Sequence, residues 1–344
     1  MTQKIHTAVP QLTVVAGSFD PSGKITIVTN MRHLGEPNRV IFDHKTNLPG
    51  KPIWANYVKG VVKNFPGGVP GFCAVVVSSV PAGGGLASSA ALEVAMFTFL
   101  EALTGDFTAK PPEKSLLCQK AEHEYVGVPC GIMDQYASIF GTKGKAILLD
   151  CRAMVHDLIP FEDRKIAILL TNSNVVQERA ESEYPVRRKE CNQAAEYFNR
   201  SSLPAASDMP PLLFKRARHV ISEIARTKEA AEALRKQNYE HFGKLMQASH
   251  ESLRDDFEVS CEEINQIVAL SMDYSQQHDD CVYGCRITGL GFGGCTISLV
   301  IKDELTPLMA YVKGRYQYSP EPSFTVVKPS YGARILRTSF ATIE

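Results

Sequence analysis

A strand-like run that passes through a glycine turn into a helix-like run constrains this chain more than any other feature. Residues 72–79 read "FCAVVVSS", and residues 80–95 continue as "VPAGGGLASSAALEVA". Consecutive glycines let the backbone approach a ligand closely, and the free amides of a helix N-terminus attract phosphate oxygens. Ser88 and Ser89 add hydroxyls in the first helical turn. The pattern predicts a phosphate-binding turn, while an ordinary strand–turn–helix with serine caps is the alternative.

Two other phosphate-binding patterns fail on spacing or context. The segment "GTKGKA" at residues 141–146 lacks the spacing and the hydroxyl of a Walker A motif. The segment "GLGFGG" at residues 289–294 matches G-x-G-x-x-G, but the β-branched run "CTISLVI" follows it where a dinucleotide site needs a helix. Neither segment therefore indicates a nucleotide site of the Walker or Rossmann type.

Composition excludes several classes of protein. The chain has 344 residues, of which 44% are hydrophobic and 22% charged, so it can form one large or two medium domains with a substantial core. Its 37 Lys and Arg residues balance 37 Asp and Glu residues, and the short basic run at 214–219 is typical of a solvated helix face. Nine scattered cysteines lack zinc-site spacing, and no apolar run is long enough for a membrane span. We expect a cytoplasmic protein with no nucleic-acid or membrane partner.

Hydrophobic periodicity predicts strands in the first half and mostly helices in the second, which favours an α+β protein of two lobes. We expect the lobes to span residues 1–165 and 166–344, with a surface loop at 201–211. Expected strands cover residues 12–18, 24–30, 72–79, 146–151, 166–174 and 324–328, with a strand–turn–strand at 285–301. Expected helices cover residues 53–65, 86–104, 111–125, 184–199, 212–236, 239–257 and 306–315.

Three motifs together resemble those of the GHMP small-molecule kinases, and within that superfamily those of the galactokinases. They are "VPAGGGLASSAALE" (80–93), "GVPCGIMDQYAS" (127–138) and "GLGFGGCTISL" (289–299). Further galactokinase-like stretches, such as "PIWANYVKGVV" and "SLRDDFEVSC", extend the likeness from about residue 8 to the C-terminus. The resemblance implies a two-lobed GHMP kinase fold with an ATP cleft between the lobes. It also implies a monomer that takes ATP, Mg²⁺ and galactose as ligands.

The resemblance also implies roles for individual residues. Asp134 would be the catalytic base that accepts the proton of the sugar hydroxyl, and Glu122 would hold Mg²⁺ together with Ser88. The galactose pocket would be lined by Gly131, Asp134 and Tyr184. The ATP-binding residues would be Trp54, Gly83, Gly84, Gly85, Leu86, Ser88 and Ser89. The "GLGFGG" turn would help to position the sugar and the phosphates.

Without the resemblance, three of these residues have other interpretations. A lone tryptophan such as Trp54 is usually a core residue. Glu122, near Lys120, is typical of a helix surface, and Asp134 is typical of an acidic residue in the first turn of a helix.

One motif of the family, roughly G-R-V-N-L-I-G-E-H-T-D-Y, does not occur in the sequence. In the family it supplies an arginine beside the catalytic aspartate, side chains for the sugar hydroxyls, and a strand. We therefore expect the N-terminal strand to be missing and phosphoryl transfer to be weakened. Three hypotheses stay open: a galactokinase, a non-catalytic ATP-binding sensor or regulator, and a kinase for another sugar such as N-acetylgalactosamine.

Overall fold

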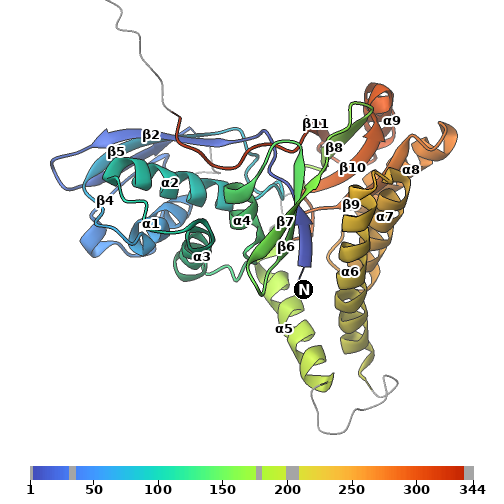
Figure 1. Ribbon diagram of the computed structural model, residues 1–344, viewed down its shortest axis with the longest axis horizontal. Helices are drawn as coiled ribbons and strands as arrows, with labels where there is room; N and C mark the ends of the chain where they lie inside the picture. Colours follow the sequence, from blue (N-terminus) through green and yellow to red (C-terminus); the bar gives the residue numbers. More distant parts are fainter. Residues whose placement is uncertain (1–2, 31–35, 176–179, 199–208, 337–344) are drawn as a thin grey trace, which may run out of the picture. The chain divides into compact units, whose positions relative to one another are not determined.

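The structure is a computed structural model that describes residues 3–30, 36–175, 180–198 and 209–336 (Figure 1). Most of the loop expected at 201–211 lies outside the described residues. The chain forms two compact units. The larger unit comprises residues 1–10, 81–88 and 142–330, and the smaller unit comprises residues 11–80, 89–141 and 331–344. The expected lobe boundary between residues 165 and 166 stays a prediction, because units defined by their internal contacts need not coincide with lobes.

The smaller unit contains one mixed four-stranded sheet in the order β2-β5-β3-β4. Its strands are β2 (Thr13–Phe19), β3 (Ile25–Thr29), β4 (Arg39–Phe42) and β5 (Phe72–Ser78). Its helical elements are η1 (His44–Thr46), α1 (Trp54–Asn64), α2 (Ser88–Thr104), α3 (Pro111–Ala121), the π-helical turn η2 (Glu122–Val126) and α4 (Met133–Phe140). Alternate residues of β3 and β5, such as Ile27 and Ala74, are buried in one apolar cluster with residues of α1 and α2. The 2.0-residue period of the strands thus directs one face of the sheet into this core.

The larger unit contains two antiparallel sheets, in the orders β1-β6-β7 and β11-β8-β10-β9. The strands are β1 (Gln3–His6), β6 (Lys145–Asp150), β7 (Val155–Pro160), β8 (Ile166–Asn172), β9 (Val282–Ile287), β10 (Cys295–Ile301) and β11 (Ser323–Val327). The helical elements are α5 (Ala180–Phe198), α6 (Pro211–Arg235), α7 (Tyr239–Asp255), α8 (Glu262–Gln277), η4 (Lys302–Glu304) and α9 (Leu305–Arg315).

Strand β8 has buried residues on both faces, which explains why its sequence is almost wholly apolar. Ile168 and Leu170 join a cluster with residues of α6 and α7, whereas Leu169 joins a cluster with residues of α8 and α9. The sheet that contains β8 is therefore covered on both sides, and it forms the centre of the larger unit.

The expected α+β class is confirmed, and each expected strand and helix has a counterpart in the structure, with ends shifted by a few residues. The sequence analysis did not identify β1, β4, β7 or α8. The three strands are short, and much of each is exposed or half-buried, so they carry little apolar periodicity. The α-helical part of the helix expected at 111–125 ends at Ala121 and continues as the π-helical turn. None of the described helices combines the length and apolar character needed to cross a membrane.

Two histidines lie in the interior of the larger unit. His219 on α6 is in hydrogen-bond contact with the Ser252 hydroxyl at 2.9 Å and stacks on the ring of Phe257. Nδ1 of His250 on α7 accepts a hydrogen bond from the backbone N–H of Ile287. Burial lowers the pKa of each imidazole to about 4, because the charged form loses its hydration. Both side chains are therefore neutral in the folded protein at neutral pH.

We predict that His219 and His250 together contribute a decrease in the free energy of unfolding as the pH falls from 7 to 5. In this range the unfolded chain protonates both histidines near pH 6.5, whereas the folded protein does not, so protons favour the unfolded state. Each histidine contributes at most about 1.4 kcal/mol per pH unit. Urea unfolding at pH 7 and pH 5 measures the change, and the wild type should lose more stability on acidification, or gain less, than a His219→Gln/His250→Gln variant. His44→Gln, at a half-exposed side chain, is the control; an equal change in all three proteins would contradict the prediction.

Candidate active site

The glycine loop, residues 81–87, connects β5 to α2 and has an unusual backbone. Gly83 and Gly85 have φ angles of 67° and 71°, a left-handed conformation that favours glycine, and Ala87 adopts 57°. Leu86 packs against the apolar cluster around β8 and so attaches the loop to the larger unit. The loop and the end of β8 line an open hollow at Ala82, Gly83, Gly84, Asn172, Asn174 and Val175. This hollow presents backbone and amide groups that suit an anionic ligand.

The turn at residues 289–294 connects β9 to β10 and packs against the glycine loop. A β-carbon on Gly289 would lie 2.9 Å from Cα of Gly85, so the two backbones touch. The same turn is tied to the end of β8, where the backbone N–H and the hydroxyl of Ser173 donate to the Gly294 carbonyl at 2.9 and 2.8 Å. Two of the three motifs in the sequence therefore meet in the larger unit.

A cluster of buried polar side chains occupies the smaller unit where α2, η2 and α4 come together. The Gln135 amide nitrogen donates to Oε2 of Glu93 at 3.0 Å and to Oε2 of Glu122 at 2.9 Å. Glu122 also accepts hydrogen bonds from the Ser89 hydroxyl and from the Cys130 thiol. A single amide thus bridges two buried carboxyl groups.

Burial and mutual repulsion determine the charge of this cluster. The pKa of Glu93 is raised well above its usual value, first by burial and then by the negative charge of Glu122. Burial also raises the pKa of Glu122, while its hydrogen bonds from Cys130 and Ser89 act in the opposite direction. Asp134 adds further repulsion to both groups. A cation near these oxygens would be stabilised by all three carboxyl groups.

The chemistry of these donors fits magnesium bound together with phosphates. Mg²⁺ prefers oxygen ligands and is commonly held by one or two carboxylates, with phosphates and water completing its shell. Glu122 and the adjacent Ser89 hydroxyl are such donors, and Oε1 of Glu93 is a buried oxygen with no hydrogen-bond partner. Within the part of the chain that the structure describes, no three His, Cys, Asp or Glu side chains gather to hold a metal by themselves.

Asp134 lies in the first turn of α4, directly after a loop that neighbouring side chains hold in place. The Cys130 carbonyl accepts a hydrogen bond from Gln119 Nε2 at 3.1 Å and contacts His123 Nε2 at 3.0 Å. Gly131 is exposed, and a β-carbon there would have its nearest neighbour at 3.9 Å. The backbone before Asp134 is therefore anchored, while the surface at Gly131 is open.

The two aromatic residues that are predicted to contact ligands, Trp54 and Tyr184, lie on different elements. Trp54 on α1 is buried in the core of the smaller unit, and its indole N–H donates to the Pro37 carbonyl at 2.8 Å. Tyr184 is half-buried on α5. Contact of Trp54 with adenine and of Tyr184 with galactose stay predictions.

The sequence analysis missed Glu93 and assigned no role to Gln135. Glu93 follows Ser89 by one helical turn in an otherwise apolar run, which is a signal for a polar group aimed into a site. Magnesium binding by Ser88 together with Glu122 stays a prediction; the structure adds a hydrogen bond from the Ser89 hydroxyl to Glu122.

Comparison with known proteins identifies the class. The GHMP kinases N terminal domain matches residues 56–142, and the GHMP kinases C terminal domain matches residues 230–308. A crystal structure of Lactococcus lactis galactokinase complexed with galactose superposes with a TM-score of 0.85 at 28% identity, covering 97% of this chain and 90% of that one. L. major mevalonate kinase in complex with R-mevalonate shares the fold, with a TM-score of 0.65 at 18% identity, covering 96% of this chain and 91% of that one. The fold and the site define a GHMP kinase.

Relatives of known activity narrow the assignment. The galactokinases of Bos taurus and Homo sapiens are each 44% identical over 343 residues, covering 96% of this chain and 86% of theirs. The galactokinase of Haemophilus influenzae Rd is 36% identical over 301 residues, covering 82% of this chain and 77% of its own. The chain belongs to the galactokinase family.

We predict that Gln135→Leu lowers the free energy of unfolding by about 1–3 kcal/mol, because two buried carboxyl groups then lose their shared donor. Urea unfolding at pH 7 measures the change. Gln277→Leu is the matched control, since this exposed side chain of α8 bonds only the Tyr311 hydroxyl in the described part of the chain, and it should stay within about 0.5 kcal/mol. Equal stability of the Gln135→Leu variant and the wild type would contradict the bridging role.

We predict that Gly289→Ala destabilises the protein by about 1–3 kcal/mol, because the residue has a φ of 78° and its β-carbon would press on Gly85. Gly314→Ala on α9 is the control, since a β-carbon there meets nothing within 4 Å and alanine favours a helix. Thermal unfolding of both variants measures the difference. A Gly289→Ala variant as stable as the control would show that the two backbones are not in close contact.

Proposed function

We propose that the protein transfers the γ-phosphate of ATP to the anomeric hydroxyl of galactose, giving galactose 1-phosphate and ADP. The observation that carries the proposal is its 44% identity to mammalian galactokinases over 96% of the chain. The solved relative from Lactococcus lactis holds galactose. Among the three hypotheses from the sequence, this observation favours the galactokinase over the sensor and over a kinase for another sugar.

Asp134 is proposed as the base of the transfer. Its carboxylate would accept the proton of the sugar hydroxyl while that oxygen forms a bond to the γ-phosphorus and the bond to the ADP oxygen breaks. The anchored loop before α4 supports this role, because a base acts only when its position is fixed. Gly131 and Tyr184 are proposed to contact the sugar.

The ATP phosphates are proposed to bind at the glycine loop and the N-terminus of α2. Free backbone amides and the hydroxyls of Ser88 and Ser89 would donate to phosphate oxygens. Bound Mg²⁺ would neutralise charge on the transferred phosphate, with Glu122 and the serine hydroxyls as its protein ligands. The full set of proposed ATP-binding residues is Trp54, Gly83, Gly84, Gly85, Leu86, Ser88 and Ser89.

We also propose that the protein acts as a monomer in the cytoplasm, with lobes that span residues 1–165 and 166–344. All nine cysteines carry free thiols, which supports a reducing compartment.

We predict that Asp134→Asn lowers the rate of galactose 1-phosphate formation by about 10²–10⁴-fold, because the amide cannot accept the proton. The dissociation constant of Mg-ATP should change far less than the rate, since the phosphate loop and the proposed magnesium ligands are intact. Product formation is followed by its coupled ADP release, and nucleotide affinity by calorimetry. Asp157→Asn is the matched control, because this exposed carboxylate on β7 pairs with Arg235.

Two results would contradict the proposal. Wild-type protein that binds ATP but forms no galactose 1-phosphate would favour the non-catalytic ATP-binding hypothesis. An Asp134→Asn variant as active as the control would show that another group accepts the proton.

A further inference from the structure

Arg216 on α6 is the largest fully buried side chain in the described part of the protein, with 1% of its surface exposed. Its Nε donates to Glu190 on α5 at 2.7 Å, its Nη2 donates to Glu258 at 2.8 Å, and its Nη1 donates to the Asp256 carbonyl. A guanidinium so completely buried requires these partners to offset its lost hydration. Arg216 therefore joins two helices to the segment that follows α7, residues 256–259.

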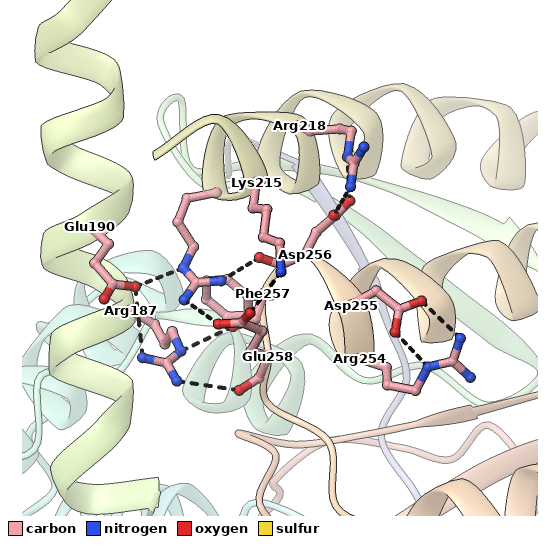
Figure 2. A network of polar contacts seen from close by, with 10 residues as sticks. Arg187, Glu190, Lys215, Arg218, Arg254, Asp255, Asp256, Phe257 and Glu258 are labelled. Atoms are coloured by element: carbon pink, nitrogen blue, oxygen red, sulfur yellow. Dashed lines mark hydrogen bonds and ion pairs between the residues drawn. The ribbon is translucent and has the colours of Figure 1, made fainter. Parts of the chain in front are cut away.

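Cationic side chains contact the first three residues of this segment, called here the 256–259 segment (Figure 2). Arg187 Nε donates to the Phe257 carbonyl at 3.1 Å, and Lys215 Nζ donates to the Glu258 carboxylate at 3.0 Å. Arg218 pairs with the Asp256 carboxylate. Glu258 has a φ of 57°, a conformation that non-glycine residues adopt only where their surroundings hold them. The cations thus fix the backbone of the segment in an otherwise unfavourable shape.

The end of the segment supports the 289–294 turn directly. The Val259 carbonyl accepts a hydrogen bond from the backbone N–H of Phe292 at 2.7 Å. A β-carbon on Gly291 would lie 2.3 Å from the same carbonyl oxygen, so the two backbones are in contact. A shift of Val259 cannot be absorbed by a flexible side chain and must move the turn.

The 289–294 turn also contacts the glycine loop, because Gly289 lies against Gly85. We propose that Arg216 is a positioning residue for nucleotide binding. Arg216 holds the 256–259 segment in place, and this segment determines the position of the 289–294 turn. The turn in its place determines the position of the glycine loop that receives the ATP phosphates. The identification of the ligand as ATP rests on the proposed function. The contacts that connect Arg216 to the glycine loop are independent of the proposed function.

A purely stabilising role for Arg216 makes a different prediction. Loss of a buried cation destabilises any protein, so a lower melting temperature alone would not distinguish the two roles. Positioning requires in addition that the turn loosens in the folded protein and that ATP binds more weakly.

The test uses Arg216→Met, with Arg216→Lys as the milder variant that keeps the charge but loses the planar fork. Arg226→Met is the matched control, because Arg226 is another largely buried arginine of α6 whose guanidinium bonds Glu223 and Ser222 on the same helix. A double variant, Arg216→Met/Glu258→Met, removes the carboxylate that the single variant leaves without its buried partner. All proteins are measured well below their melting temperatures.

Two quantities are measured: amide hydrogen exchange in residues 288–295 without nucleotide, and the dissociation constant of Mg-ATP. We expect both Arg216 variants to exchange faster at Phe292 and to bind ATP about tenfold more weakly, equivalent to about 1.4 kcal/mol. The control, Arg226→Met, should lose thermal stability, but its exchange at Phe292 and its affinity for ATP should not change. The double variant should recover stability relative to Arg216→Met but keep the weak ATP binding.

Unchanged exchange and unchanged ATP affinity in the Arg216 variants, with only a lower melting temperature, would overturn the inference. Failure of the proposed function has a different signature, because wild-type protein would then either bind no ATP or bind ATP without forming galactose 1-phosphate. Exchange at residues 288–295 is measured without ATP, so it tests the connection between Arg216 and the 289–294 turn even if the protein binds no ATP. An unchanged exchange rate in Arg216→Met would overturn this connection, and a faster rate would support it.

Discussion

The backbone of the 289–294 turn lies so close to three other segments that no β-carbon fits between them. A β-carbon on Gly289 would lie 2.9 Å from Gly85, one on Gly291 would lie 2.3 Å from the Val259 carbonyl, and one on Gly293 would lie 2.8 Å from the Val175 carbonyl. Backbone contacts cannot adapt as side chains can, so the turn fixes the glycine loop, the 256–259 segment and the end of β8 relative to one another. The hollow beside the glycine loop depends on this arrangement.

The smaller unit contains a cluster of buried carboxyl groups. Glu93 and Glu122 are buried on α2 and η2, and Gln135 is the amide that bridges them. Burying two carboxyl groups side by side reduces stability, and perturbed acids of this kind gather at functional sites more often than elsewhere. Asp134, adjacent to Gln135 in sequence and predicted to be the base, adds to the same negative field. The perturbed pKa values of this cluster therefore support the proposal that it holds a cation beside the proposed base.

The sequence predicted the features that depend on local pattern. The apolar period predicted β5, α1 and α2, and the consecutive glycines between β5 and α2 predicted the glycine loop. Short, exposed strands such as β4 and β7 were missed because few of their residues are buried. The roles of Glu93, Gln135 and Arg216 depend on partners far apart in the chain, which no local period encodes. The assignment of Asp134 and Tyr184 came from the resemblance and not from spacing.

The central claim is that the glycine loop and the start of α2 receive the phosphates of ATP. Hydrogen exchange of residues 81–92, measured with Mg-ATP, with adenosine and without ligand, tests this claim most directly. The account predicts slower exchange in this segment with Mg-ATP and little change with adenosine, because the amides bind phosphate oxygens. Equal protection by adenosine, or no protection by Mg-ATP at a concentration that saturates the protein, would contradict it.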